Sequence, residues 1–135
     1  MCQAYDLGII ARSPLAHGVL AGRYTDAAKL PEGSRGTLRK VFHERITQEG
    51  IDVGFRFAKK SEEKEYTAAQ LAVAWVLNQP GIAGTILGPR NLEQFEGLLP
   101  ALDILLDDDD MKFFDSLVPP GRFVVNYFNT SGWMK

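Results

Sequence analysis

Two short aliphatic runs constrain the fold more than any other feature of the sequence. LGIIARS covers residues 7–13 and stops at Ser13-Pro14, and IAGTILG covers residues 82–88 and stops at Gly88-Pro89. Runs of this length, bounded by turn residues, are typical of buried strands. Helical patterns lie between the two runs, so we expect parallel pairing through a right-handed crossover.

The segment from Ile46 to about Glu63 is the first predicted helix. Its apolar residues recur at spacings of three and four, which produces a stripe along one face. The stripe consists of Val53, Phe55, Phe57 and Ala58, and two glycines, Gly50 and Gly54, weaken the helical pattern. A second helix is expected to follow Thr67, which forms a capping-box pair with Gln70. Its residues are apolar nearly all round, which indicates burial on most sides, and Pro80-Gly81 ends it.

Two more helices are expected after the second aliphatic run. In NLEQFEGLLPAL, the side chains of Leu92, Phe95 and Leu99 share a face, and Pro100 breaks the pattern. Residues 107–117 form the last helix, where the run Asp107–Asp110 is interpreted as a capped, solvated start rather than a metal site. No metal site is predicted elsewhere, because neither His17 nor His43 has metal-ligand spacing.

Residues 16–45 form a long excursion with weak periodicity and at most one short helix. Loops of this length are uncommon in compact domains and are often functional. Basic residues gather here, namely Arg23, Lys29, Arg35, Arg39 and Lys40. The overall order predicts an α/β fold, but two strands leave two unpaired edges and little sheet to cover. The chain therefore reads as part of a larger α/β structure.

The composition excludes several classes of protein. The chain has 135 residues, a net charge of −2 and one cysteine, Cys2. This charge does not favour a nucleic-acid or anionic-membrane partner, and a single cysteine excludes an intramolecular disulfide. No apolar stretch approaches the ~18 residues that span a bilayer, and no signal peptide is evident. These features favour a soluble, cytoplasmic protein.

A polar turn follows each predicted strand, and adjacent parallel strands would place the two turns side by side. Ligands of parallel α/β folds bind at the carboxyl ends of the strands. Gly88 lets backbone approach a ligand, and Arg90 offers a fork of donors suited to a phosphate. Arg90 is therefore a candidate phosphate ligand at the start of a helix. The alternative is a solvated arginine after a Gly-Pro turn.

Three segments together resemble aldo/keto reductases. IIARSPLAHGVLAGRY is similar to the seventh strand of that family and its turn, TAAQLAVAWVLNQPGI to the helix that follows, and TILGPRNLEQFEGLL to the eighth strand. The order and spacing agree over nearly the whole chain. The resemblance implies the last two strands of a TIM (β/α)8 barrel, with their helices and C-terminal tail, as one domain over residues 1–135. It also implies NADP(H) as cofactor and reduction of aldehydes or ketones by hydride transfer.

The resemblance assigns cofactor roles to matching positions. The nicotinamide ribose and pyrophosphate would lie against the first turn, the pyrophosphate would meet Arg23 and a belt residue, Arg35, and the 2′-phosphate end would meet the second turn. Arg90 would favour NADPH, which alone carries the 2′-phosphate. The predicted cofactor residues are Arg12, Ser13, Pro14, Leu15, His17, Arg23, Arg35, Gly88, Arg90 and Gln94. By the same resemblance Phe123, Tyr127, Phe128 and Trp133 line a substrate pocket or, equally, cover the outer surface of the barrel.

The sequence departs from the family pattern in three ways. Arg12 stands where an aromatic residue often stacks on the nicotinamide. Gly97 and Leu98 stand where a Glu-Asn pair contacts adenine, which puts the affinity for adenine in doubt. The catalytic Asp, Tyr, Lys and His belong to the first half of the barrel, so no residue here is assigned to catalysis.

The resulting expectation is the cofactor-binding C-terminal portion of a reductase, inactive alone. A full barrel takes roughly 250 residues, so a truncated gene or a separate complementing N-terminal chain is expected, with self-association through exposed strand edges. A non-catalytic module that binds nucleotide or a partner is the alternative. An independent small α/β domain with a superficial likeness is a third possibility.

Overall fold

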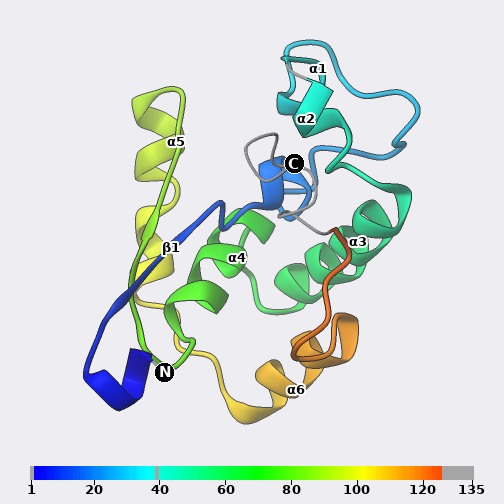
Figure 1. Ribbon diagram of the computed structural model, residues 1–135. Coiled ribbons are helices and arrows are strands. Elements are labelled where there is room, and N and C mark those ends of the chain that lie inside the picture. Colours follow the sequence, from blue (N-terminus) through cyan, green and yellow to red (C-terminus); the bar gives the residue numbers. More distant parts are fainter. Residues whose placement is uncertain (1, 39, 126–135) are drawn as a thin grey trace.

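The computed structural model describes residues 2–38 and 40–125. Figure 1 shows a short two-stranded sheet beside a group of helices. The elements in chain order are η1 (Cys2–Tyr5), β1 (Ile9–Arg12), η2 (Ala16–Gly18), α1 (Arg35–Leu38), α2 (Lys40–His43), α3 (Gln48–Glu63), α4 (Ala68–Leu77), β2 (Ile82–Ile86), α5 (Leu92–Glu96), η3 (Leu99–Leu102) and α6 (Asp108–Leu117).

The two aliphatic runs form strands β1 and β2, which pair in parallel as the sequence predicts. Ile10 pairs with Gly84 and Arg12 with Ile86, after an irregularity in register between Ile9 and Ile10. Both strands are shorter than the runs that predicted them. β1 ends at Arg12 because the backbone of Ser13 turns into the left-handed region, with φ 59°. The carboxyl ends of the two strands, and the turns after them, therefore lie at the same end of the sheet.

The long excursion between β1 and α3 contains three short helical pieces, where the sequence suggested at most one. They are η2, α1 and α2, none longer than four residues. A small core of Val19, Tyr24, Ile46 and Ile51 fixes this region, with Leu30 packed against it. These contacts come from widely separated positions, which explains why local periodicity did not predict the helices.

Helix α3 begins at Thr47, whose side chain accepts a hydrogen bond from the Gly50 N–H at 3.1 Å. Its buried face consists of Ile51, Gly54, Phe57 and Ser61. The predicted stripe is therefore wrong at Phe55, which is 54% exposed. Gly54 belongs to the buried face because the backbone of Val19 crosses the helix there, so close that a Cβ atom at position 54 would lie 2.8 Å from the Val19 carbonyl oxygen.

Helix α4 confirms the capping box and the predicted burial. Gln70 N–H donates to Thr67 Oγ1 at 3.2 Å, and Thr67 N–H donates to Gln70 Oε1 at 3.0 Å. The helix lies at the centre of the main core. Its members are Phe57, Leu71, Ala72, Val73, Ala74, Leu98, Ala101, Ile104 and Phe114. Pro80-Gly81 follows the helix as predicted, with Gly81 at φ 84°.

The helical segment after β2 is interrupted earlier than the sequence predicts. α5 ends at Glu96, and Pro100 sits in the first turn of η3 rather than at the end of a continuous helix. The face shared by Leu92, Phe95 and Leu99 is exposed, at 68%, 40% and 42%. Leu98, between them in sequence, is the residue that enters the core.

The acidic run caps α6 as predicted, but it is not fully solvated. Asp107 Oδ1 accepts hydrogen bonds from the N–H groups of Asp109 and Asp110, and the Asp110 bond holds the pKa of Asp107 below its ordinary value. Asp110 itself is buried, and its Oδ2 lies 2.6 Å from Lys64 Nζ. This bond raises the pKa of Lys64 and ties α6 to the end of α3.

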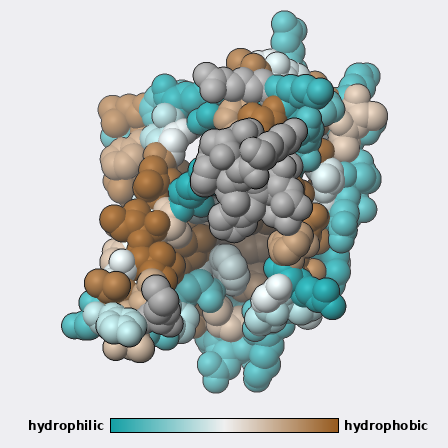
Figure 2. All heavy atoms as spheres, viewed as in Figure 1, coloured by the Kyte–Doolittle hydropathy of each residue, from teal (hydrophilic) through white to brown (hydrophobic). Residues whose placement is uncertain are grey.

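Apolar side chains are exposed along the sheet and the segments after it. Within the described residues neither strand pairs with a third one. Figure 2 shows hydrophobic residues gathered on the left, over the part of the molecule where Figure 1 places β1, β2 and α5. The exposed apolar residues of this region include Leu7, Ile10, Ile86, Leu92, Leu102 and Leu105. In the described part of the chain, no helix is long and apolar enough to cross a membrane.

The contact between α3 and the Val19 backbone predicts the effect of Gly54→Ala. The added methyl group would push against a carbonyl oxygen, at a cost of about 1–3 kcal/mol that exceeds the ~1 kcal/mol gain in helix propensity. Urea denaturation should show a lower midpoint. The matched control is Gly50→Ala, whose methyl group would lie 3.2 Å from Thr47 Oγ1 and at ordinary contact distance from the side chains of Val124 and Val19, so the midpoint should fall less than in Gly54→Ala. A Gly54→Ala variant as stable as the unaltered chain would contradict this packing.

Candidate functional site

A pocket of about 830 Å³ lies where the turns after β1 and β2 meet. Because the strands are parallel neighbours, both turns reach it from the same edge of the sheet. The excursion supplies a third wall, and α4 and the segment after α5 supply the rest. The lining residues are Arg12–Leu15, His17, Gly18, Ala21, Arg23, Arg35, Phe42, Arg45, Thr67, Ala69, Ile86–Arg90, Gln94, Gly97 and Leu98.

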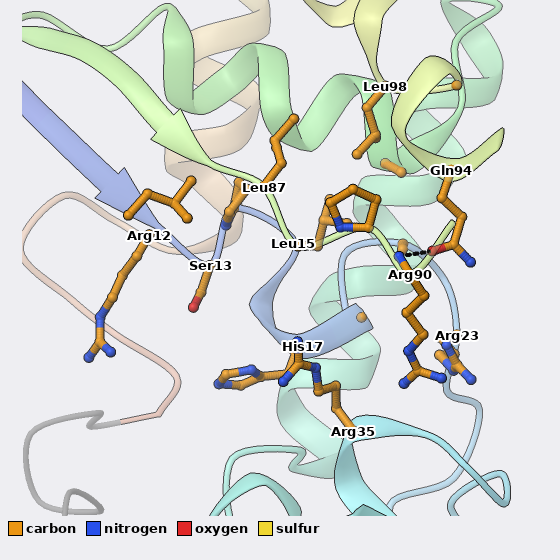
Figure 3. Close-up of a pocket in the computed structure, with 18 of the residues that line it drawn as sticks. Arg12, Ser13, Leu15, His17, Arg23, Arg35, Leu87, Arg90, Gln94 and Leu98 are labelled. Carbon is orange, nitrogen blue, oxygen red and sulfur yellow. Dashed lines mark hydrogen bonds between the residues drawn. The ribbon is translucent and has the colours of Figure 1, made fainter. Parts of the chain in front are cut away.

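The ten residues predicted to bind a cofactor all line this one pocket. They are Arg12, Ser13, Pro14, Leu15, His17, Arg23, Arg35, Gly88, Arg90 and Gln94, and they come from three separate segments of the sequence. Figure 3 shows most of them together in the pocket. The substrate residues are placed differently. Phe123 is 65% exposed and does not line the pocket, and Tyr127, Phe128 and Trp133 lie outside the described residues.

The turn after β1 is built from backbone in the left-handed region. Ser13, Ala16 and His17 have φ values of 59°, 45° and 60°, and Gly18 has φ 103°. Such conformations are unfavourable for residues other than glycine and persist only where surrounding contacts fix them. One such contact is the hydroxyl of Tyr24, which is buried and donates to the His17 carbonyl at 2.9 Å. The turn therefore presents its side chains in a fixed arrangement.

The turn after β2 is held by a chain of hydrogen bonds. Asn91 Oδ1 accepts from the Gln94 N–H at 2.9 Å, and Gln94 Oε1 accepts from the Arg90 N–H at 2.9 Å. The guanidinium of Arg90 donates from Nη1 to the Gly33 carbonyl at 3.0 Å, which links this turn to the excursion. Since α5 has only five residues, its dipole adds little, and the guanidinium is the main attraction for an anion.

The pocket carries positive charge from several directions. Five arginines line it, namely Arg12, Arg23, Arg35, Arg45 and Arg90, and no Asp or Glu from the described ranges does so. Figure 3 shows the guanidinium groups of Arg23 and Arg90 near each other, while the side chain of Arg35 extends toward His17. A cleft lined by one sign of charge concentrates ligands of the opposite sign. The chain as a whole has a net charge of −2, so this positive charge is local to the pocket.

His17 is held in its neutral form by this environment. Burial, followed by the charges of Arg45, Arg35 and Arg12, lowers the pKa of His17 from 6.5 to about 4. The Nε2 atom of His17 lies 3.5 Å from Arg45 Nη1, and the imidazole packs against the ring of Phe42 at 4.8 Å between centroids. The guanidinium of Arg35 lies over the same Phe42 ring, with its central carbon 5.5 Å from the ring centroid. A neutral imidazole has one donor and one acceptor nitrogen, and since a guanidinium can only donate, Nε2 is the acceptor toward Arg45.

Several pocket residues were missed at the sequence level. Arg45 is only 8% exposed and lies nearest His17, yet it sits in a segment without periodicity. Phe42 and Leu98 also line the pocket. The sequence signal nearest to Arg45 is the cluster of basic residues from Arg23 to Lys40, which ends five positions before Arg45.

Comparison with known protein families gives a match over most of the chain. A family model described as "Aldo/keto reductase family" matches residues 1–119. The chain belongs to the aldo/keto reductase family. This membership confirms the resemblance of the three segments and shows that the likeness is not superficial, as the third possibility had supposed.

Curated relatives lie at about one-third identity. An uncharacterized oxidoreductase, YrpG, of Bacillus subtilis is 34% identical over 116 residues, which covers 85% of this chain and 33% of the relative. A putative voltage-gated potassium channel subunit beta of Schizosaccharomyces pombe is 34% identical over 123 residues, 86% of this chain and 35% of the relative. Protein tas of Escherichia coli is 30% identical over 101 residues, 75% of this chain and 29% of the relative. The chain thus spans about a third of the length of these relatives.

The position of His17 among the arginines of this aldo/keto reductase pocket predicts its titration. Because the pKa of His17 is lowered in the folded state, its imidazole stays neutral in the folded chain until about pH 4. The unfolded chain takes up this proton near pH 6.5, so the contribution of His17 makes stability fall as pH decreases from about 6.5 to 4, and this contribution is constant below that window. Nuclear magnetic resonance titration of the imidazole should give a midpoint near 4.

The variant Arg45→Met should raise the pKa of His17, because Arg45 is the arginine whose positive charge lowers that pKa most. The matched control is Arg56→Met, an exposed arginine on α3 outside this pocket, which should leave the titration unchanged. A His17 midpoint near 6.5 in the unaltered chain would contradict both the burial of the imidazole and its position among the arginines.

Proposed function

We propose that this chain is the cofactor-binding portion of an NADPH-dependent reductase of aldehydes or ketones. The observation that carries the proposal is the pocket between the two turns, with five arginines and, among the described residues, no carboxylate. NADPH carries a pyrophosphate and a 2′-phosphate, and its anionic groups match a cleft of this charge. Membership of the aldo/keto reductase family supports the same cofactor class.

The position of Arg90 supports its assignment to the 2′-phosphate. Its guanidinium already bridges to the Gly33 carbonyl across the mouth of the pocket. Its backbone N–H is engaged by Gln94, so the side chain is fixed near the turn while its remaining donors stay available. A planar fork of donors recognises a phosphate better than a point charge does. Arg35 lies close by, with one terminal nitrogen 3.7 Å from the position that a Cβ on Gly88 would occupy, and suits the pyrophosphate.

Hydride transfer itself needs groups that we do not assign to this chain. When bound, the nicotinamide supplies the hydride, and in the family a tyrosine supplies the proton. None of the described residues matches the family's catalytic Asp, Tyr, Lys and His. We therefore propose that the chain alone binds cofactor without turnover and reduces a small-molecule aldehyde or ketone only when the barrel is completed.

A completing partner is favoured by the exposed apolar residues of the sheet. Ile10 and Ile86 are 68% and 60% exposed on strands whose outer edges have no partner within the described residues. We propose that a complementing N-terminal chain, or a second copy of this chain, covers them. No nucleic-acid or membrane partner is proposed. A cytoplasmic location is proposed from the single cysteine.

The alternative function is a non-catalytic module that binds nucleotide or a partner chain. It is favoured by the same observation that leaves catalysis unassigned, since none of the described residues that line the arginine-rich pocket is assigned to catalysis. Both proposals expect no turnover from the chain alone, so they are separated by whether turnover appears when a complementing N-terminal portion completes the barrel.

The substitution Arg90→Ala tests the role of Arg90 in binding NADPH. Loss of the charged hydrogen bonds should weaken NADPH binding by about 1–3 kcal/mol and leave NADH binding nearly unchanged, because NADH lacks the 2′-phosphate. Cofactor fluorescence titration measures both. Arg122→Ala, at an exposed arginine outside the pocket, is the control. Equal weakening for the two cofactors would remove the role given to Arg90.

A further prediction concerns the turnover of NADPH by the chain alone. NADPH absorbance should not decrease when the purified chain is mixed with the cofactor and 4-nitrobenzaldehyde, because no general acid is assigned to the pocket. Addition of a complementing N-terminal portion of a relative should restore oxidation of NADPH. Steady turnover by the chain alone would show that it contains a proton donor that we have not assigned.

A further inference from the structure

We propose that this pocket binds the reduced cofactor, NADPH, more tightly than the oxidised cofactor, NADP⁺. This preference rests on the proposed function, because it concerns the same ligand in the same pocket. Loss of a hydride leaves one positive charge on the nicotinamide ring, so the two forms differ by one unit of charge. The phosphate groups are common to both forms and largely cancel in the comparison. The preference therefore depends on how the groups that line the pocket act on a cation.

Arginines stand at separate places along the pocket. All five line it, and in Figure 3 the guanidinium of Arg12 lies apart from those of Arg23 and Arg90. His17 lies between the two places in this view. The charge of Arg12 contributes to the lowered pKa of His17, so it acts on the middle of the pocket as well as on its own side. A cation inside the pocket therefore meets positive charge wherever it lies.

No carboxylate of this chain offsets the positive charge. None of the Asp and Glu side chains in residues 2–38 and 40–125 lines the pocket, and the other positions of the sequence contain neither residue. The ring of Phe42 is a surface that can attract a cation. However, the guanidinium of Arg35 lies over this ring, with its central carbon 5.5 Å from the centroid, and repels a second cation.

The apolar part of the lining disfavours a cation for a second reason. Leu15, Leu87 and Leu98 line the pocket, and all three belong to the main core or pack against it. Contact with apolar surface removes water from a charged ring, which costs free energy unless a group of opposite charge replaces the water. The dihydronicotinamide ring of NADPH is neutral and avoids this cost. Desolvation and charge repulsion therefore favour the same form of the cofactor.

The contacts proposed above identify Arg12 as the arginine that acts most directly on the nicotinamide ring. The proposed function assigns the 2′-phosphate to Arg90 and the pyrophosphate to Arg35. The nicotinamide riboside is attached to the pyrophosphate on the side away from the ribose that carries the 2′-phosphate. The side chain of Arg35 extends toward His17, and Arg12 lies beyond it in the same view (Figure 3). An extended cofactor that continues in this direction reaches the side of the pocket that Arg12 lines.

The test compares the dissociation constants of NADPH and NADP⁺ for the full chain, each measured by isothermal titration calorimetry. At an ionic strength of about 0.01 M, where the Debye length is ~30 Å, NADP⁺ should bind at least about fivefold more weakly than NADPH. At about 0.15 M, where the Debye length is ~8 Å, the preference should be smaller. A smaller ratio at low ionic strength, or a preference that salt does not change, would overturn the inference. If neither form binds, the proposed function itself fails, and that result is distinct from binding without a preference.

Two substitutions at the exposed Arg12 separate charge from shape. Arg12→Gln removes the positive charge and should lower the preference for NADPH by at least about twofold, whereas Arg12→Lys keeps the charge and should retain the preference. Arg122→Gln makes the neutral change at an exposed arginine outside the pocket, and its preference should equal that of the unaltered chain. An unchanged preference in Arg12→Gln would contradict the role of Arg12. An equal loss in Arg12→Lys would show that the shape of the side chain decides, which would overturn the role of charge.

Discussion

The parallel pairing of β1 with β2 is the interaction on which the candidate site depends. About 70 residues separate the strands in sequence, yet Arg12 pairs with Ile86 and the two turns leave the sheet at the same edge. If the strands were antiparallel, the turns would lie at opposite ends. The buried helix α4 makes this pairing possible, because it covers the sheet and returns the chain to its starting edge.

The pocket combines a fixed frame with concentrated charge. Left-handed backbone after β1 and the Asn91–Gln94–Arg90 hydrogen bonds after β2 fix the frame. The arginines come from different segments, and Arg90 ties two of these segments together through Gly33. Burial and the charges of three of these arginines together lower the pKa of His17. Such a pocket holds anionic groups by direction and charge, while its inner wall is apolar.

Much of the fold follows from local sequence patterns, and the rest depends on distant contacts. The two strands, the Thr67–Gln70 capping box and the start of α6 were predictable because neighbouring residues determine them. The burial of Gly54 in place of Phe55 was not, because it depends on the backbone of Val19, 35 positions away. The ten cofactor positions came from the family pattern, and the pocket brings them together. Arg45 was missed because no local pattern marks a residue that packs against His17.

The most direct test of the account is a titration of the isotope-labelled chain with NADPH, followed through its backbone amide resonances. If the two turns form one site, the amides of Ser13, of residues 15–18, of Gly88 and of Arg90 should shift together, with one dissociation constant. The exposed far end of α6 should not respond. Shifts confined to one of the two turns, or two sets with different dissociation constants, would contradict the shared pocket from which the proposed function follows.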